Sequence, residues 1–137
     1  MREILFRGKQ IDNGEWVYGY YEFYNGGHYI NVQTDRVNSG GYPIREFIEV
    51  IPETVGQHTG LTDKNGKKIF EGDILDCVDR IVFVKWHDYC GTWDCDFIKY
   101  KGVACSNGVT PEEWKYRAVI VGNIHDNSEL LKGGDDK

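Results

Sequence analysis

Four Asn-Gly pairs constrain the fold of this chain more than any other feature. Asn-Gly favours the two-residue turn of a β-hairpin because both residues tolerate a positive φ. The pairs are spread along the 137 residues, at Asn13-Gly14, Asn25-Gly26, Asn65-Gly66 and Asn107-Gly108. Their number and spacing predict a protein built from hairpins.

Apolar and aromatic segments flank the first two turns. Residues 4–11 are expected to pair with residues 16–24, and residues 16–24 with residues 29–33, as an N-terminal meander. The polar, Gly-rich segment 35–42 is expected to be an exposed loop. The apolar pattern of residues 45–50 fits either a strand or one helical turn.

The second half predicts another hairpin, more strands and one short helix. Residues 61–70 would form a hairpin closed by Asp63-Lys64-Asn65-Gly66. Residues 80–86 alternate as a strand, with an expected inward set of Ile81 and Phe83 and with the other face formed by Val82, Val84 and Trp86. Further strand residues are expected at Ile74 and Val78. Thr110-Pro111-Glu112-Glu113 is typical of a helix start, and residues 117–124 read as a closing strand.

Composition narrows the function classes. Hydrophobic residues make up 40% and charged residues 28%, as in soluble globular proteins. A formal charge of −6 opposes attraction to phosphate backbones, which disfavours non-specific nucleic-acid binding. No apolar stretch approaches the roughly 20 residues of a membrane helix. A cytoplasmic protein without membrane contact is therefore expected.

Residues 51–75 are rich in glycine and acidic residues, which favour sharp backbone turns. Gly60 and Gly72 are expected where the chain turns between strands, because glycine adopts positive φ without steric cost. The Asp73 carboxylate can accept hydrogen bonds from nearby backbone N–H groups. This interpretation gives the segment a structural role that needs no ligand.

The same segment resembles the central motif of the YopX family. The opening residues 2–7 and the closing residues 121–127 are also similar to that family, so nearly the whole chain is covered. His58 and Ser128 depart from the family pattern, which favours an aromatic residue and a proline there. The residues that carry the resemblance, all expected to be structural, are Gly56, Thr59, Gly60, Leu61, Asp63, Gly66, Glu71, Gly72, Asp73, Gly122 and Asn123.

The resemblance implies a phage or prophage protein of the bacterial cytoplasm. It also implies a mainly β fold with little helix, in which an SH3-like barrel fills the C-terminal half and the N-terminal meander packs beside it. Residues 1–131 would be a single domain with possible sub-units 1–55 and 56–131, followed by a disordered tail, 132–137. Because small barrels serve many roles, no activity follows from the fold.

Four cysteines and one histidine are the candidates for metal or thiol chemistry. Their spacing differs from that of zinc sites, which place ligands two to four residues apart in each knuckle. Free thiols in a reducing cytoplasm are expected instead, and no metal or cofactor is predicted. The residues are Cys77, His87, Cys90, Cys95 and Cys105. An enzyme would require His87 and Cys90 to converge with Asp94 or Asp96 in one pocket.

Aromatic and basic residues interleave in the second half and form the candidate interaction surface, Trp86, Trp93, Lys99, Tyr100 and Lys101. Burial of these rings in the core is the alternative explanation. We expect a non-enzymatic module that binds another protein, either its own copies or a host or phage partner, because aromatic-rich strand edges can pair with another chain. A small-barrel binder of single-stranded nucleic acid is the second hypothesis.

Overall fold

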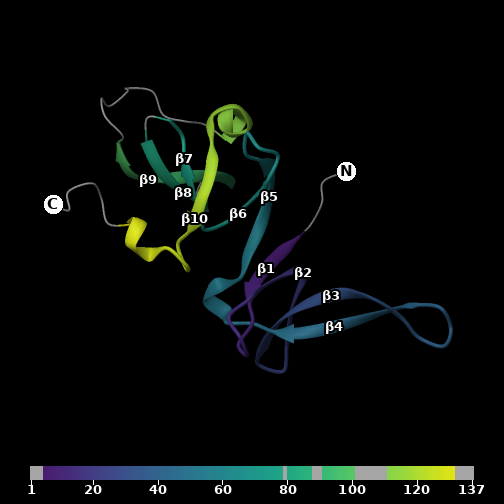
Figure 1. The fold of residues 1–137 in the computed structure, drawn as a ribbon. Coiled ribbons are helices and arrows are strands. Elements are labelled where there is room, and N and C mark those ends of the chain that lie inside the picture. Colours follow the sequence, from purple (N-terminus) through teal and green to yellow (C-terminus); the bar gives the residue numbers. More distant parts are fainter. Residues whose placement is uncertain (1–4, 79, 88–90, 101–110, 132–137) are drawn as a thin grey trace. The chain divides into compact units, whose positions relative to one another are not determined.

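The structure is a computed structural model that describes residues 5–78, 80–87, 91–100 and 111–131 (Figure 1). Contacts divide the chain into two compact units, residues 1–58 and residues 59–137. Antiparallel strands dominate both units, which confirms the mainly β prediction. Strand β5 (Gly56–Thr62) begins in the first unit and ends in the second.

The first unit contains the expected meander. Its strands are hydrogen-bonded in the order β4-β3-β2-β1-β5, and a single 3-10 turn, η1, precedes β5. The bounds are β1 Phe6–Lys9, β2 Trp16–Tyr24, β3 Gly27–Val37, β4 Pro43–Glu49 and η1 Pro52–Thr54.

The first two Asn-Gly pairs form the predicted turns. Asn25 and Gly26 both have positive φ, 54° and 84°, and they join β2 directly to β3 through the pair Tyr24–Gly27. At the other turn Gly14 has a φ of 72°, and the Asn13 side chain accepts the N–H of Glu15. Local turn chemistry therefore fixes the register of the meander.

In residues 35–50 the structure extends strand β3 beyond its predicted end and shows a strand where either a strand or a helical turn was possible. Residues 35–37 were expected in a loop, but β3 continues to Val37, which pairs with Pro43. Residues 45–49 form part of strand β4 and not a helical turn. The strand is favoured over a helical turn because Gln33 pairs with Arg45 across the hairpin. In addition, the Thr34 hydroxyl donates a hydrogen bond to the Ile44 carbonyl at 2.6 Å.

The second unit contains the predicted 61–70 hairpin, in which β5 pairs with β6 (Lys68–Phe70), and a four-stranded sheet. That sheet has the order β10-β7-β8-β9, with bounds β7 Asp73–Asp76, β8 Arg80–His87, β9 Thr92–Tyr100 and β10 Val119–Asn123. In the described residues β9 and β10 are separate edges of this sheet, so its hydrogen bonds do not close the barrel that the resemblance implied.

The helices are single turns. They are η2 Pro111–Glu113, α1 Trp114–Arg117 and η3 Ser128–Leu131, which agrees with the short helix predicted after residue 110. Thr110 itself, Asn107-Gly108 and the tail 132–137 lie outside the described residues. None of the helices in the described part of the chain has the length and apolar character needed to cross a membrane.

The core of the second unit shows that the inward face of β8 was predicted wrongly. Val82 and Val84 are the buried residues, with 2% and 1% of their surface exposed, whereas Ile81 and Phe83 are half-buried. Both faces of this strand are apolar, and a register shift separates Ile81 from Val82, so alternation alone could not select the inward face. The core cluster comprises Ile69, Leu75, Cys77, Val82, Val84, Trp114 and Ala118.

The turn between β7 and β8 contains a strained residue. Val78, which was expected in a strand, has a φ of 78°, and its N–H is bonded to the Asp76 side chain. A β-branched side chain in the left-handed region is disfavoured by contact between its Cβ and the backbone. The Val78 side chain is 62% exposed, so little packing offsets this strain.

Replacing Val78 with glycine is therefore expected to stabilise the protein. Relief of the strain, less the entropy of the freer unfolded chain, should raise the free energy of unfolding by about 1 kcal/mol. Urea denaturation followed by tryptophan fluorescence measures the change. V78A keeps the Cβ and is the control; equal stability of the two variants would show that φ is not the cause.

Candidate functional site

The central motif fastens backbone segments to one another, most clearly at Asp63. One carboxylate oxygen of Asp63 accepts the N–H groups of Asn65 and Lys67, both at 2.9 Å, and the other accepts the N–H of Ile120 at 3.1 Å. Asp63 is only 2% exposed. A single buried carboxylate therefore closes the β5–β6 hairpin and holds β10, which is 57 residues away in sequence.

Thr59 and Gly66 act on the same hairpin. The Thr59 hydroxyl donates to the Ile69 carbonyl at 2.9 Å and accepts the N–H of Leu61 at 3.1 Å, which ties β5 to β6. Gly66 has a φ of 82°, and its N–H reaches the Asp63 carbonyl at 3.0 Å, so the third Asn-Gly pair also forms a turn. Thr59 and Gly66 thus both shape the backbone of this hairpin.

Gly72 and Asp73 organise the turn before β7. Gly72 has a φ of 92°; its N–H donates to the Val84 carbonyl, and its own carbonyl accepts the N–H of Ile124. The buried Asp73 carboxylate accepts the N–H of Phe70 at 2.7 Å. The predicted sharp turn at Gly72 and the predicted hydrogen bonding of Asp73 are confirmed.

Gly60 needs a correction. It has the expected positive φ, 87°, but it lies inside β5 and not between two strands. The remaining motif residues of this segment have packing positions: Gly56 is buried where β5 pairs with Arg7 of β1, Leu61 packs against the core cluster, and Glu71 is half-buried in the turn before Gly72.

The closing motif, residues 121–127, also holds its backbone in place through side-chain hydrogen bonds. The Asn123 side chain accepts the N–H groups of His125 and Asp126, at 3.0 and 2.9 Å, and the Asn127 side chain accepts the N–H of Asn123 at 3.1 Å. A Cβ on Gly122 would lie 2.4 Å from Oδ1 of Asn127. A side chain at position 122 would therefore displace the Asn127 side chain, which accepts the N–H of Asn123.

The cysteines do not provide an activated thiol in the described residues. Cys77 is buried and Cys95 half-buried, and neither of them is part of a disulfide. Burial, followed by the negative charge of Asp94, raises the pKa of Cys95 to about 12, so this thiol stays protonated at neutral pH and is a poor nucleophile. Cys90 and Cys105 lie outside the described residues, as does the side chain of His87.

Asp94 and Asp96 lie two positions apart in β9 and therefore share one face of that strand. Asp94 stands opposite Lys85 in the register, and the Lys85 ammonium lies 3.4 Å from the Asp96 carboxylate. Asp94 accepts the N–H of Cys95 at 2.8 Å. The described residues contain no group of three or more His, Cys, Asp or Glu side chains that could hold a metal ion.

The predicted aromatic surface is only partly brought together. Trp86 and Trp93 are cross-strand neighbours whose rings meet edge to face at 5.0 Å; Trp86 is 40% exposed, whereas Trp93 packs against the core. The side chains of Lys99 and Tyr100, and the whole of Lys101, lie outside the described residues. Lys85, which precedes Trp86 in the sequence, forms an ion pair with Asp96, and the Asp96 carboxylate offsets the positive charge of the lysine.

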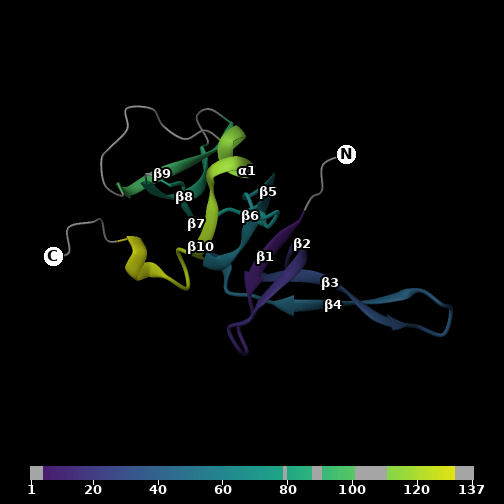
Figure 2. The ribbon, with the colours of Figure 1, turned by 45° about the horizontal axis from the view of Figure 1, so that its top comes forward.

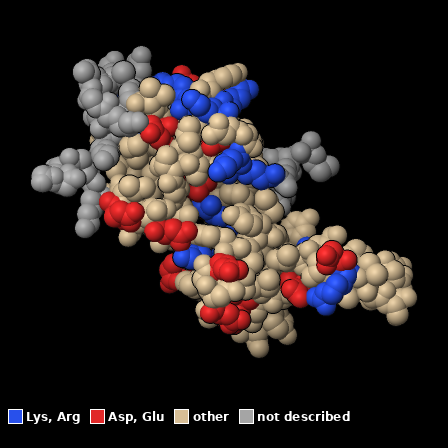
Figure 3. Space-filling model, viewed as in Figure 1, with Lys and Arg blue, Asp and Glu red and all other residues tan. Residues whose placement is uncertain are grey.

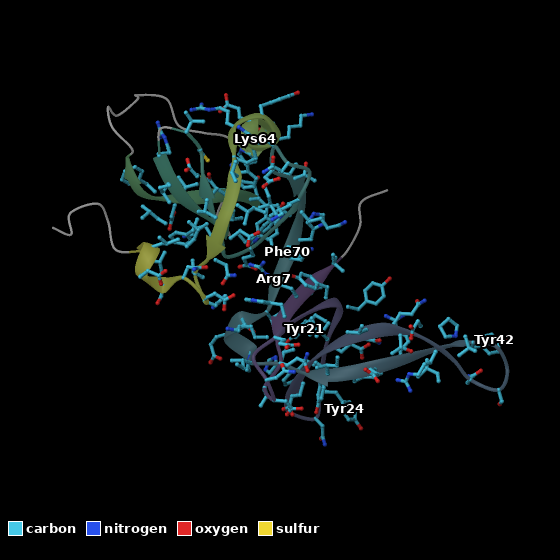
Figure 4. All side chains as sticks on the ribbon, in the orientation of Figure 1. Arg7, Tyr21, Tyr24, Tyr42, Lys64 and Phe70 are labelled. Carbon is cyan, nitrogen blue, oxygen red and sulfur yellow. The ribbon has the colours of Figure 1, made fainter. Side chains whose placement is uncertain are left out.

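A second aromatic surface, which the sequence interpretation did not assign as a site, lies on the sheet of the first unit. Glu22, Tyr24, Tyr29 and Phe47 come from β2, β3 and β4 and line an open depression of about 530 Å³. The alternation of Tyr18, Tyr20 and Tyr24 along β2 was a signal for it, because alternate residues share one face. Figure 4 shows Tyr24 at the end of β2 that leads into β3.

These observations define a mainly β protein with two antiparallel sheets, in which the motif residues fasten backbone. A family model described as YopX protein matches residues 5–132, and this chain belongs to the YopX family. No curated protein matches the chain.

Among solved structures, the chain is similar to the protein EF1440 from Enterococcus faecalis, known from a crystal structure. The two share 21% sequence identity and superpose with a TM-score of 0.54, over 96% of this chain and 100% of the other. That similarity concerns the fold.

Proposed function

We propose that this protein is a non-enzymatic accessory or regulatory protein of a phage or prophage, which works in the bacterial cytoplasm by binding another protein. The form of binding that we propose is self-association. Membership of the YopX family is shown, and the phage or prophage origin is what the resemblance to that family implies. The bonding of Asp63, Asp73 and Asn123 to backbone, together with the protonated thiol of Cys95, supports a protein that does not act by bond-making chemistry.

The observation that carries the proposal is the outer part of the β3–β4 hairpin, residues 32–46, called the ribbon below. Strand β2 pairs with β3 only from Gly27 to Asn31, so from Val32 onward β3 has β4 as its single partner among the described strands. Figures 1 and 2 both show this hairpin extending past the ends of β1 and β2. A two-stranded ribbon alone is marginally stable in water, and contact with another chain would stabilise it.

The tip of the ribbon is ordered internally and presents apolar side chains. The Asn38 side chain accepts the N–H groups of Gly40 and Tyr42, at 2.9 and 3.0 Å. Val37 and Tyr42 are 61% and 70% exposed, and residues 37–44 carry no charge. Figure 3 shows this end of the hairpin as a continuous uncharged area, and Figure 4 shows Tyr42 near its end.

An exposed tyrosine beside a valine on a preformed turn is suited to contact with a protein. Aromatic side chains bury much surface at little entropic cost, and tyrosine is enriched in the residues that dominate interface energies. The edge strand β4 lies next to the tip and offers backbone groups to a partner strand. The ribbon would thus contribute both apolar and backbone contacts.

Sedimentation equilibrium tests this proposal. The wild-type protein is expected to form species heavier than 15.8 kDa, and Y42S is expected to weaken their association by at least about tenfold. Y116S is the matched control, because Tyr116 is also 70% exposed but lies on α1. A wild-type protein that stays at 15.8 kDa at high concentration, or equal effects of the two substitutions, would contradict self-association through the ribbon.

A further inference from the structure

The depression lined by Glu22, Tyr24, Tyr29 and Phe47 has the composition of a cation site. Three aromatic rings and one carboxylate surround it. The faces of aromatic rings attract ammonium and guanidinium groups, and cages of rings bind quaternary and methylated ammonium groups. A nearby carboxylate adds charge complementarity. Glu49, the cross-strand neighbour of Tyr29, places a second acidic side chain on the same face.

The same face of the sheet already holds cations on rings. The Arg45 guanidinium lies 5.3 Å from the centre of the Tyr20 ring, and the Arg7 guanidinium lies 4.6 Å from that of Trp16. No described lysine or arginine lies over Tyr24, Tyr29 or Phe47, or pairs with Glu22. These rings are therefore open to a cation from outside the described chain.

Two features hold the lining groups in position. The Asn31 side chain donates to one carboxylate oxygen of Glu22 at 2.9 Å, and its own oxygen accepts the Arg45 Nε–H at 2.5 Å. The Tyr29 ring lies over Gly27, where an added Cβ would be 2.8 Å from the ring. The carboxylate and this ring are thus oriented before any ligand arrives, which lowers the cost of binding.

We infer that Glu22, Tyr24, Tyr29 and Phe47 bind the ammonium group of a lysine side chain presented by a partner protein. The inference rests on the proposed function, because it assigns one contact of the partner. Lysine fits better than arginine: one Glu22 oxygen already accepts a hydrogen bond from Asn31, which competes with the bidentate contact that arginine favours, whereas a compact ammonium needs only one oxygen.

A side chain from a larger partner fits the depression better than a free small molecule does. Sites for small molecules bury most of the ligand surface. Here Tyr24 and Phe47 are themselves 70% and 56% exposed, so the rim encloses little. A partner protein would cover the rim and contact the neighbouring exposed rings of Tyr18 and Tyr20 on the same face.

Titration of the isotopically labelled full chain with acetyl-Gly-Lys-Gly-amide, followed by NMR, tests the inference. Shifts are expected at the amides of Glu22, Tyr24, Tyr29 and Phe47. The same peptide with Nε-acetyl-lysine, which has no charge, is expected to bind at least about fivefold more weakly. Equal binding of the two peptides, or shifts confined to other strands, would overturn the inference.

Matched variants separate the site from the rest of the sheet. E22Q removes the charge and Y24L one ring, and each is expected to weaken binding of the lysine peptide by about fivefold. E46Q is the control for E22Q: Glu46 lies on the opposite face of the hairpin, paired with Arg36 at 2.6 Å. An E22Q variant that binds as the wild type does, or as E46Q does, would contradict the role of the carboxylate.

The two proposals fail in different ways. If the lysine peptide does not bind while Y42S still dissociates the wild-type assembly, the inference is wrong and the proposed function stands. If the peptide binds at these four residues but no association through the ribbon is found, self-association is wrong and the lysine site stands.

Discussion

Asp63→Ala is expected to lower the free energy of unfolding by about 4 kcal/mol, because three backbone N–H groups lose their acceptor at once. The N–H groups belong to Asn65, Lys67 and Ile120, and the carboxylate that they share is almost fully buried. An unsatisfied buried donor costs about 1–3 kcal/mol, and entry of water should recover part of the sum. Urea denaturation followed by tryptophan fluorescence measures the loss.

Two further variants make this result interpretable. D63N keeps one carbonyl oxygen as an acceptor, so roughly half of the loss is expected. D12A is the control, since Asp12 is exposed, and its effect should stay within about 0.5 kcal/mol. A loss below about 1 kcal/mol in D63A would mean that the carboxylate is not what holds the hairpin and β10.

Gly19→Ala is the second large effect that we expect, with a loss of about 3 kcal/mol. A Cβ at this position would lie 2.2 Å from the Asn31 carbonyl oxygen and 3.2 Å from a methyl group of Ile30. The obstacle is backbone in the middle of the sheet, so β2 and β3 would have to separate. Thermal unfolding followed by circular dichroism measures the change.

Gly14→Ala provides the comparison for this steric argument. Gly14 has a φ of 72° but nothing within 4 Å of an added Cβ, so only backbone strain is expected, about 1 kcal/mol. The predicted order is thus a larger loss at Gly19 than at Gly14. The reverse order would show that the sheet adapts easily between β2 and β3.

The elements that local chemistry decides could be predicted from the sequence. Asn25-Gly26 and Asn65-Gly66 specify their turns because Gly26, Gly66 and also Asn25 adopt a positive φ, and the strands on either side follow. The hydrogen bonding of Asp73 also follows from neighbours in sequence, since its partner is Phe70. Such features need no knowledge of the rest of the fold.

Features that depend on distant segments could not be predicted. The inward face of β8 is set by the core that Trp114 and Ala118 complete, although Ile81 and Val82 are equally apolar. The bond from Ile120 to Asp63 joins segments that no local pattern connects. The depression beside Glu22 forms only where β2, β3 and β4 lie side by side, and no single segment of the sequence reveals this. Patterns within single segments pointed to Trp86 and Trp93 of β8 and β9 as the interaction surface instead.

We propose that the acidic and glycine residues of the motif hold backbone segments in place, and that the ribbon makes the contacts by which the protein works. Sedimentation equilibrium at low temperature, which gives the association constants of the folded D63N variant and of Y42S, separates these two roles. Folded D63N is expected to associate within about twofold of wild type, whereas Y42S is expected to lose at least about tenfold in association constant. Loss of association in folded D63N, with association of Y42S unaffected, would mean that the motif and not the ribbon makes the contacts.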